Sequence, residues 1–279
     1  MLFTLAICTL AANPASCSSG QGTCQMATAS PSAATWRSAQ TASFVVYAAA
    51  AENEPGGFAQ DCESLRAGLM AKWLGLSTSP PWNPRCIVVL HADRASYLAA
   101  VGGQGVQTSG SSLTQVGGER VVLRRIDLSA DRPGQASATL PHELTHVVLA
   151  DHFLRRPPPR WADEGMAVLA DTAQKRSAHR SDLERALQSG LAFPVGDLCR
   201  CESCPAAQQA AFYGQSVSLV EFLVSRRGPQ QIVPFLDKAA LVGMDRALAE
   251  DFAIRDTVEL ERQWRAFLTP TVATSAPQP

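Results

Sequence analysis

Residues 141–153 read PHELTHVVLADHF, and they place two histidines, His142 and His146, four positions apart with Glu143 directly after the first. On an α-helix, side chains four positions apart lie on the same face, about 5–6 Å apart at Cβ. Both imidazoles can therefore reach one zinc ion at about 2.0–2.1 Å. Glu143 is rotated by one residue, so it can accept a proton from a water in the open coordination position without becoming a ligand. The spacing predicts two metal ligands and a general base.

A zinc site that keeps one position open needs a third protein ligand. His152 stands where the metzincin pattern places its last histidine, but that pattern turns the chain at a glycine, and this chain has Leu149 there. Leucine does not readily adopt the positive φ that glycine supplies. If the helix continues instead, His152 points away from His146 and suits the negative end of the helix dipole.

Glu164 is the better candidate for the third ligand. It lies in PRWADEGMAVLAD (159–171), eighteen residues after His146, and the proline-rich segment RRPPPRW (155–161) separates two predicted helices. Two antiparallel helices joined by such a turn can bring Glu164 beside the histidine pair. The site would then consist of two histidines, one glutamate and one water. The motif by itself also fits a helix with two surface histidines and a solvated glutamate.

HELTH followed by RWADEGMAVLAD resembles the gluzincin zinc metallopeptidases, specifically a peptidase-MA-like bacterial branch with a W-x-x-E-G-x-A pattern on its second helix. Trp161, Glu164, Gly165 and Ala167 match that pattern. From about residue 36 to residue 268 the chain is similar to these enzymes in layout only. The resemblance implies that zinc bound by the two histidines and Glu164 supports peptide-bond hydrolysis.

The resemblance also implies a donor for the oxyanion, supplied by a later helix. Tyr213 in FYGQSVSLVEFL matches a similar Y-x-Q-S segment and is the candidate catalytic residue beside Glu143. A core tyrosine with one satisfied hydrogen bond is the alternative for Tyr213. Gln215 is a further candidate for the site.

Many gluzincins carry an aspartate four residues after the ligand glutamate, where it orients a zinc histidine. This chain has Val168 there, and Asp163 or Asp171 would have to substitute. In gluzincins an edge strand before the motif helix pairs with extended substrate. RVVLRRIDL (120–128) has that position, and its Arg124 and Arg125 either influence substrate preference or are simply solvated.

The remaining pattern predicts an α+β fold in a peptidase domain spanning residues 35–269. Strands are expected at 43–49 and 85–92, with a hairpin over 111–128 that turns at Gly117 and Gly118, and helices at 58–76 and 93–102. The motif helix is expected to begin with Thr139 as N-cap and Pro141 in its first turn, and a second helix is expected over 162–173. From residue 208 the chain reads as helical almost to its end. A mixed α/β part with a small sheet (35–130) would precede a mostly helical, zincin-like part (131–269), with the active site at the junction.

The first twelve residues, MLFTLAICTLAA, are apolar and too short to span a bilayer. We interpret residues 1–16 as a signal or lipoprotein leader, with a mispredicted start or a buried strand as the alternative. Cys17 is a possible lipid anchor, residues 17–34 form a flexible linker, and residues 270–279 form a disordered tail. The expected location is extracytoplasmic: secreted, periplasmic or lipid-anchored.

Composition excludes several classes of function. Hydrophobic residues make up 46% and charged residues 18% of the chain, as in globular proteins, and the net charge of -1 gives no basis for nucleic-acid binding. Of the eight cysteines, the six that follow Cys17 are an even number and are expected to form disulfides, with Cys62 and Cys86 as plausible partners. CRCESC (199–204) could instead hold a structural metal.

These observations together predict an exported zinc peptidase acting on peptide or protein substrates. A catalytically silent binding module that zinc stabilises is one alternative. A zinc hydrolase of non-peptide amides or esters is the other.

Overall fold

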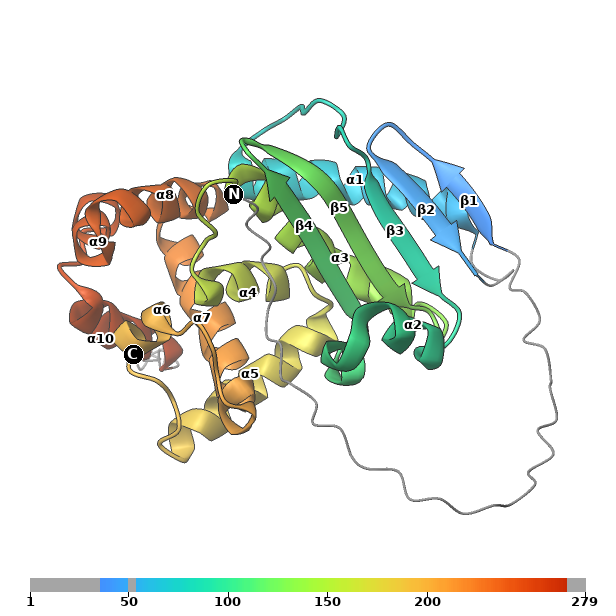
Figure 1. The fold of residues 1–279 in the computed structure, drawn as a ribbon. Coiled ribbons are helices and arrows are strands. Elements are labelled where there is room, and N and C mark those ends of the chain that lie inside the picture. Colours follow the sequence, from blue (N-terminus) through green and yellow to red (C-terminus); the bar gives the residue numbers. More distant parts are fainter. Residues whose placement is uncertain (1–35, 50–53, 270–279) are drawn as a thin grey trace, which may run out of the picture.

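The structure, a computed structural model, describes residues 36–49 and 54–269 (Figure 1). The expected leader, linker and tail lie outside these residues. Within the described ranges, no helix is both long enough and apolar enough to cross a membrane.

One mixed sheet of five strands forms the N-terminal part, in the spatial order β1-β2-β3-β5-β4. The strands are β1 (Arg37–Gln40), β2 (Phe44–Ala48), β3 (Cys86–His91), β4 (Gly110–Gly117) and β5 (Arg120–Ser129). β2, β3 and β5 run parallel, whereas β1 and β4 pair antiparallel at the two edges. The predicted α+β class with a small sheet is confirmed, and β1 is an addition to it.

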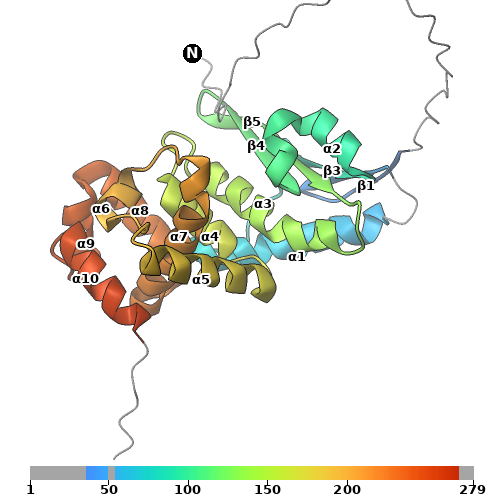
Figure 2. The same ribbon diagram turned by 90° about the horizontal axis from the view of Figure 1, so that it is seen from below.

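Helices cover both faces of this sheet. Figure 2 shows α1 (Pro55–Leu74) and α3 (Gln135–His152) on one face and α2 (Arg94–Val101) on the other. Val46, Val88 and Ile126 are fully buried. Their side chains belong to the core that the sheet shares with α1 and α3.

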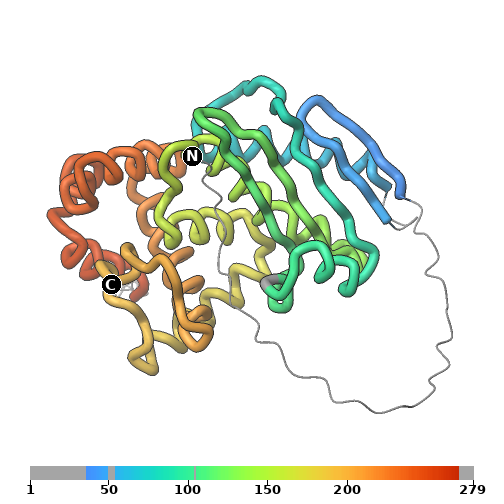
Figure 3. Tube along the Cα trace, viewed as in Figure 1, coloured from blue at the N-terminus to red at the C-terminus, as the bar shows by residue number. Residues whose placement is uncertain are grey.

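After α3 the chain is helical, and Figure 3 shows that it passes from the sheet to this helical part through α3. The helices are α4 (Arg160–Val168), α5 (Ala173–Gln188), α6 (Val195–Arg200), α7 (Gln209–Arg227), α8 (Ile232–Val242), α9 (Met244–Phe252) and α10 (Thr257–Leu268). α7 is buried along most of its length and packs against α4 and α5. It is the central helix of this part.

The expected start of the motif helix was wrong. α3 begins at Gln135, after Gly134 with a φ of 72°, so Thr139 is a buried interior residue and not the N-cap. Pro141 also lies inside the helix, where its missing N–H leaves the Ser137 carbonyl without its usual partner. The second helix is shorter than expected, because α4 ends at Val168.

The expected edge strand was also wrong. RVVLRRIDL is part of β5, which lies between β3 and β4, and β4 is the edge strand. Arg124 is only 4% exposed, because it points into the core, where its guanidinium lies 4.9 Å from the ring centroid of Trp82. Arg125 forms hydrogen bonds of 2.6 and 2.8 Å with Asp127. Arg124 is therefore neither solvated nor free to contact a substrate.

The cysteines of the described ranges are free thiols. Cys62 and Cys86 are fully buried, and burial raises the pKa of Cys62 to about 12. The disulfide expected between them is not formed in this structure. Within the described residues, the thiols of the 199–204 segment do not converge as metal ligands would.

Candidate metal centre

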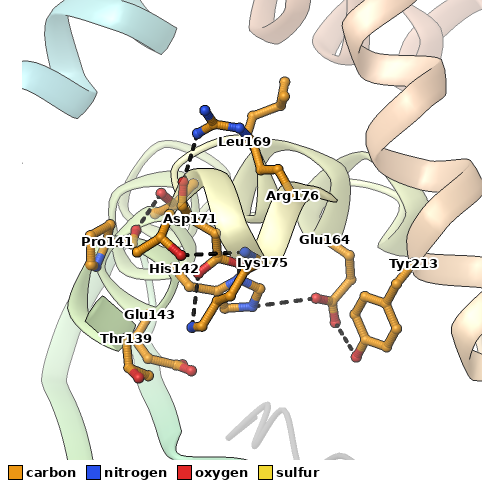
Figure 4. Close-up of polar contacts among 12 residues, drawn as sticks. Thr139, Pro141, His142, Glu143, Glu164, Leu169, Asp171, Lys175, Arg176 and Tyr213 are labelled. Carbon is orange, nitrogen blue, oxygen red and sulfur yellow. Dashed lines mark hydrogen bonds and ion pairs between the residues drawn. The ribbon is translucent and has the colours of Figure 1, made fainter. Parts of the chain in front are cut away.

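His142, His146 and Glu164 converge at the junction of the two parts. The histidines lie on one face of α3, and Glu164 comes from α4, which packs beside α3. Glu164 Oε2 is 3.7 Å from His142 Nε2 (Figure 4) and 3.8 Å from His146 Nε2. Ligands of a tetrahedral zinc ion lie roughly 3.3 Å apart. A small inward shift would therefore let all three hold one ion.

The outer nitrogen of each imidazole faces a carboxylate. His142 Nδ1 is 3.0 Å from Asp171 Oδ2, within a hydrogen bond. His146 Nδ1 is also 3.0 Å from a carboxylate oxygen, Asp163 Oδ2, but out of line for a hydrogen bond. A proton kept on Nδ1 leaves the Nε2 lone pair for a metal ion. Both aspartates named as substitutes for the missing one at position 168 thus lie against the histidine pair.

Asp171 is the better supported of the two. It is 4% exposed, and Lys175 Nζ donates to its Oδ1 over 3.0 Å. Burial works against the charged carboxylate, but the hydrogen bonds from His142 and Lys175 outweigh it and lower the pKa of Asp171. The usual four-residue spacing fails here because α4 ends at Val168 and the following turn carries Asp171 back to His142.

The charges around His146 favour a cation. Burial disfavours the protonated imidazole, but the carboxylates of Asp163, Glu164 and Glu143 together outweigh burial and raise the pKa of His146 to about 10. Burial also raises the pKa of Glu164. Two imidazoles and a carboxylate form a donor set that zinc favours, so the residues present fit a zinc ion.

Glu143 lies between α3 and the edge strand. It is 8% exposed, and the Ser112 hydroxyl of β4 donates to its Oε2 over 2.9 Å. β4 can approach this closely because residue 110 is glycine: a Cβ at Gly110 would lie 2.5 Å from Thr139 Cγ2 and 2.7 Å from Glu143 Cγ. Sequence reasoning missed Ser112 and Gly110, since no local pattern links β4 to the motif helix.

Tyr213 reaches the centre from α7, as expected, but its hydroxyl is engaged. It donates to Glu164 Oε1 over 3.4 Å (Figure 4). His179 packs its ring against Tyr213 with 5.8 Å between centroids. Gln215 is fully buried and exchanges hydrogen bonds of 2.9 and 2.6 Å with the backbone of Phe193, so it holds a loop and does not reach the site.

His152 lies outside the centre, in agreement with the continued helix. Its Nε2 is 2.8 Å from Asp237 Oδ2 of α8. This ion pair joins the C-terminal end of α3 to the helical part.

The second motif positions α4 against α7. Trp161 is 1% exposed and Ala167 is fully buried. A Cβ at Gly165 would lie 2.6 Å from the Ser216 carbonyl oxygen of α7, so a side chain there would push the helices apart. The glycine after Glu164 therefore allows the close helix packing that holds Glu164 in place.

A cavity of about 540 Å³ opens beside His146, between β4, α3 and the proline-rich loop. Its lining residues are Thr114, Val116, Gly118, His146, Ala150, Phe153, Leu154, Arg155, Pro157, Pro158 and Asp163. Most of these side chains are apolar, and the volume is in the range of sites for small molecules or several side chains.

No protein-family model matches the chain, and no curated protein sequence matches it either.

Proposed function

We propose that the chain is a zinc-dependent peptidase of the gluzincin type, with the metal centre between two zincin-like helices, α3 and α4. The observation that carries this proposal is the convergence of His142 Nε2, His146 Nε2 and Glu164 Oε2. Bound zinc would lower the pKa of a water and polarise a carbonyl.

Glu143 is the proposed general base. Its carboxylate would take the proton of the attacking water and pass it to the leaving amine. The hydrogen bond from Ser112 fixes one carboxylate oxygen, Oε2, and Oε1 would take this proton. An orienting partner of this kind keeps a buried base in one conformation.

β4 and the cavity provide a place for a peptide. Only one side of β4 is paired in the described sheet, so its other side offers backbone donors and acceptors to an extended chain. Thr114 and Val116 lie on one face of β4 and line the cavity beside His146. A substrate paired with β4 would therefore place a side chain between apolar walls next to the metal centre.

Cleavage of a diverse peptide mixture, read by mass spectrometry, tests the proposal. The wild type would be compared with Glu143→Gln and with Glu184→Gln, a matched change at an exposed position of α5. We expect cleavage by the wild type and by Glu184→Gln, and none by Glu143→Gln. Folded, zinc-loaded wild type that cleaves no peptide would contradict the proposal. A parallel ester and amide panel would then separate a different hydrolase from a silent binding module.

A further inference from the structure

Glu164 has two carboxylate oxygens with different surroundings. Oε2 faces both imidazoles at 3.7 and 3.8 Å, whereas Oε1 accepts a hydrogen bond from Tyr213. A carboxylate held at one oxygen by a fixed donor presents the other oxygen in a defined direction. Tyr213 is well placed for this, because its ring packs between His179 and Phe212.

Arg160 lies beside the same part of α7. It is the first residue of α4, and its guanidinium lies 4.5 Å from the ring centroid of Phe212, the neighbour of Tyr213. Burial raises the pKa of Tyr213, and the nearby charge of Arg160 opposes that increase. Arg160 Nη1 is buried and has no hydrogen-bond partner in the described structure.

Arg160 and Glu164 are four positions apart on one helix, a spacing that normally gives an ion pair. Within the described residues, no direct pair forms between them, although the charge of Arg160 acts on Glu164. The hydroxyl of Tyr213 donates to Glu164, and the charge of Arg160 also acts on this hydroxyl.

We propose that Tyr213 and Arg160 are positioning residues for the metal ligand Glu164: Tyr213 holds Oε1 so that Oε2 points at the histidines, and Arg160 holds the Tyr213 hydroxyl. This inference rests on the metal centre of the proposed function. It replaces the oxyanion role expected for Tyr213, because the hydroxyl is directed at the ligand. Partners of this kind change metal affinity by about 10–100-fold when removed.

Zinc affinity, measured by competition with a chelating indicator, tests the inference without any substrate. Tyr213→Phe keeps the ring and should weaken zinc binding by about 10–100-fold. Tyr97→Phe is the matched control, because it also removes a buried hydroxyl, which bonds Thr108 at 2.8 Å and touches no ligand. We expect zinc affinity to be unchanged in Tyr97→Phe.

Arg160→Met should also weaken zinc binding, and Arg160→Lys should restore part of the loss. Arg226→Met, which removes another guanidinium stacked on a phenyl ring of α7, is the control. Because Arg160 acts through Tyr213, the double variant Arg160→Met/Tyr213→Phe should bind zinc no more weakly than Tyr213→Phe. If the losses of zinc affinity in the two single variants added up in the double variant, Arg160 would not act through Tyr213.

Two outcomes separate this inference from the proposed function. Tyr213→Phe with unchanged zinc affinity but lost cleavage would overturn the inference and return Tyr213 to the reaction itself. Zinc-binding wild type that cleaves nothing, with the losses above still observed, would sustain the inference and contradict the peptidase. Wild type that binds no zinc would contradict both.

Discussion

The sheet contains a histidine–carboxylate cluster of its own. This cluster and the candidate metal centre differ in the imidazole nitrogen that faces the carboxylate. His91 Nε2 lies 2.7 Å from Asp127 Oδ1, and Asp127 is also held by Arg125. In the metal centre the carboxylates face the Nδ1 atoms, and both Nε2 atoms are left to converge on Glu164.

This difference has a chemical consequence. The sheet cluster balances its charges internally, whereas the metal centre gathers four carboxylates, those of Glu143, Asp163, Glu164 and Asp171, around two histidines. Histidine beside carboxylate is therefore not enough to indicate a metal site. A metal site also requires imidazole nitrogens whose lone pairs are free and point toward one another, as the Nε2 atoms of His142 and His146 do.

The largest predicted difference between the clusters concerns the reaction. Glu143→Gln should lower peptide cleavage by about 10²–10⁴-fold, because the amide cannot accept the proton of the attacking water, while zinc stays bound. Asp127→Asn, the same kind of change in the sheet cluster, should leave cleavage near the wild-type rate. Zinc content and initial rates would be measured together. Equal losses of cleavage in Glu143→Gln and Asp127→Asn would contradict a role for Glu143 as the general base.

The second prediction concerns zinc-dependent stability. At a free zinc concentration about 100 times Kd, wild type should gain about 2.7 kcal/mol, which corresponds to an increase in Tm of roughly 5–10 °C. His146→Ala should lose this gain, because it removes a ligand. His91→Ala should keep it, whatever its own Tm. Differential scanning calorimetry with and without zinc checks this, and a persisting gain in His146→Ala would place the metal elsewhere.

The third prediction concerns the carboxylate that orients His142. Asp171→Asn should weaken zinc binding by about 10–100-fold, because the amide no longer favours a proton on Nδ1. Asp127→Asn should leave zinc affinity unchanged, since its histidine presents no free Nε2. Indicator titrations of both variants give the comparison. Unchanged affinity in Asp171→Asn would mean that the hydrogen bond does not orient the ligand.

The smallest predicted effect is on acid stability. Burial disfavours ionised Asp127, but Arg125 and His91 outweigh it and lower the pKa of Asp127. A carboxyl with a lowered folded-state pKa contributes stability that is present above its unfolded pKa, about 3.9, and lost as pH falls through the folded value. Asp127→Asn should therefore lose less stability than wild type below about pH 4. Urea unfolding from pH 3 to 6 measures this, and parallel curves would contradict it.

The local parts of the site could be predicted from sequence. The i, i+4 spacing fixed His142 and His146 on one helix face, and the proline run before Trp161 correctly indicated a turn between two helices. The bounds of the main strands agree with the structure within a few residues. Periodicity and spacing are properties of short segments, so they can be recognised in a single sequence.

The contacts between segments could not be predicted in the same way. Asp171 reaches His142 only because α4 stops at Val168, and Ser112 reaches Glu143 only because β4 lies at the sheet edge. The contact of Asp171 with His142 depends on where a helix ends, and that of Ser112 with Glu143 depends on how a strand packs against a helix. Pro141 misled the prediction of the helix start, because a proline inside a helix is costly and therefore uncommon.

The most direct test of the metal centre is an anomalous difference map, collected at the zinc edge from crystals of zinc-loaded protein. The account predicts one peak, about 2.0–2.2 Å from His142 Nε2, His146 Nε2 and Glu164 Oε2. A peak on the Nδ1 side of either histidine, or at the cysteines of the 199–204 segment with none at this centre, would contradict it.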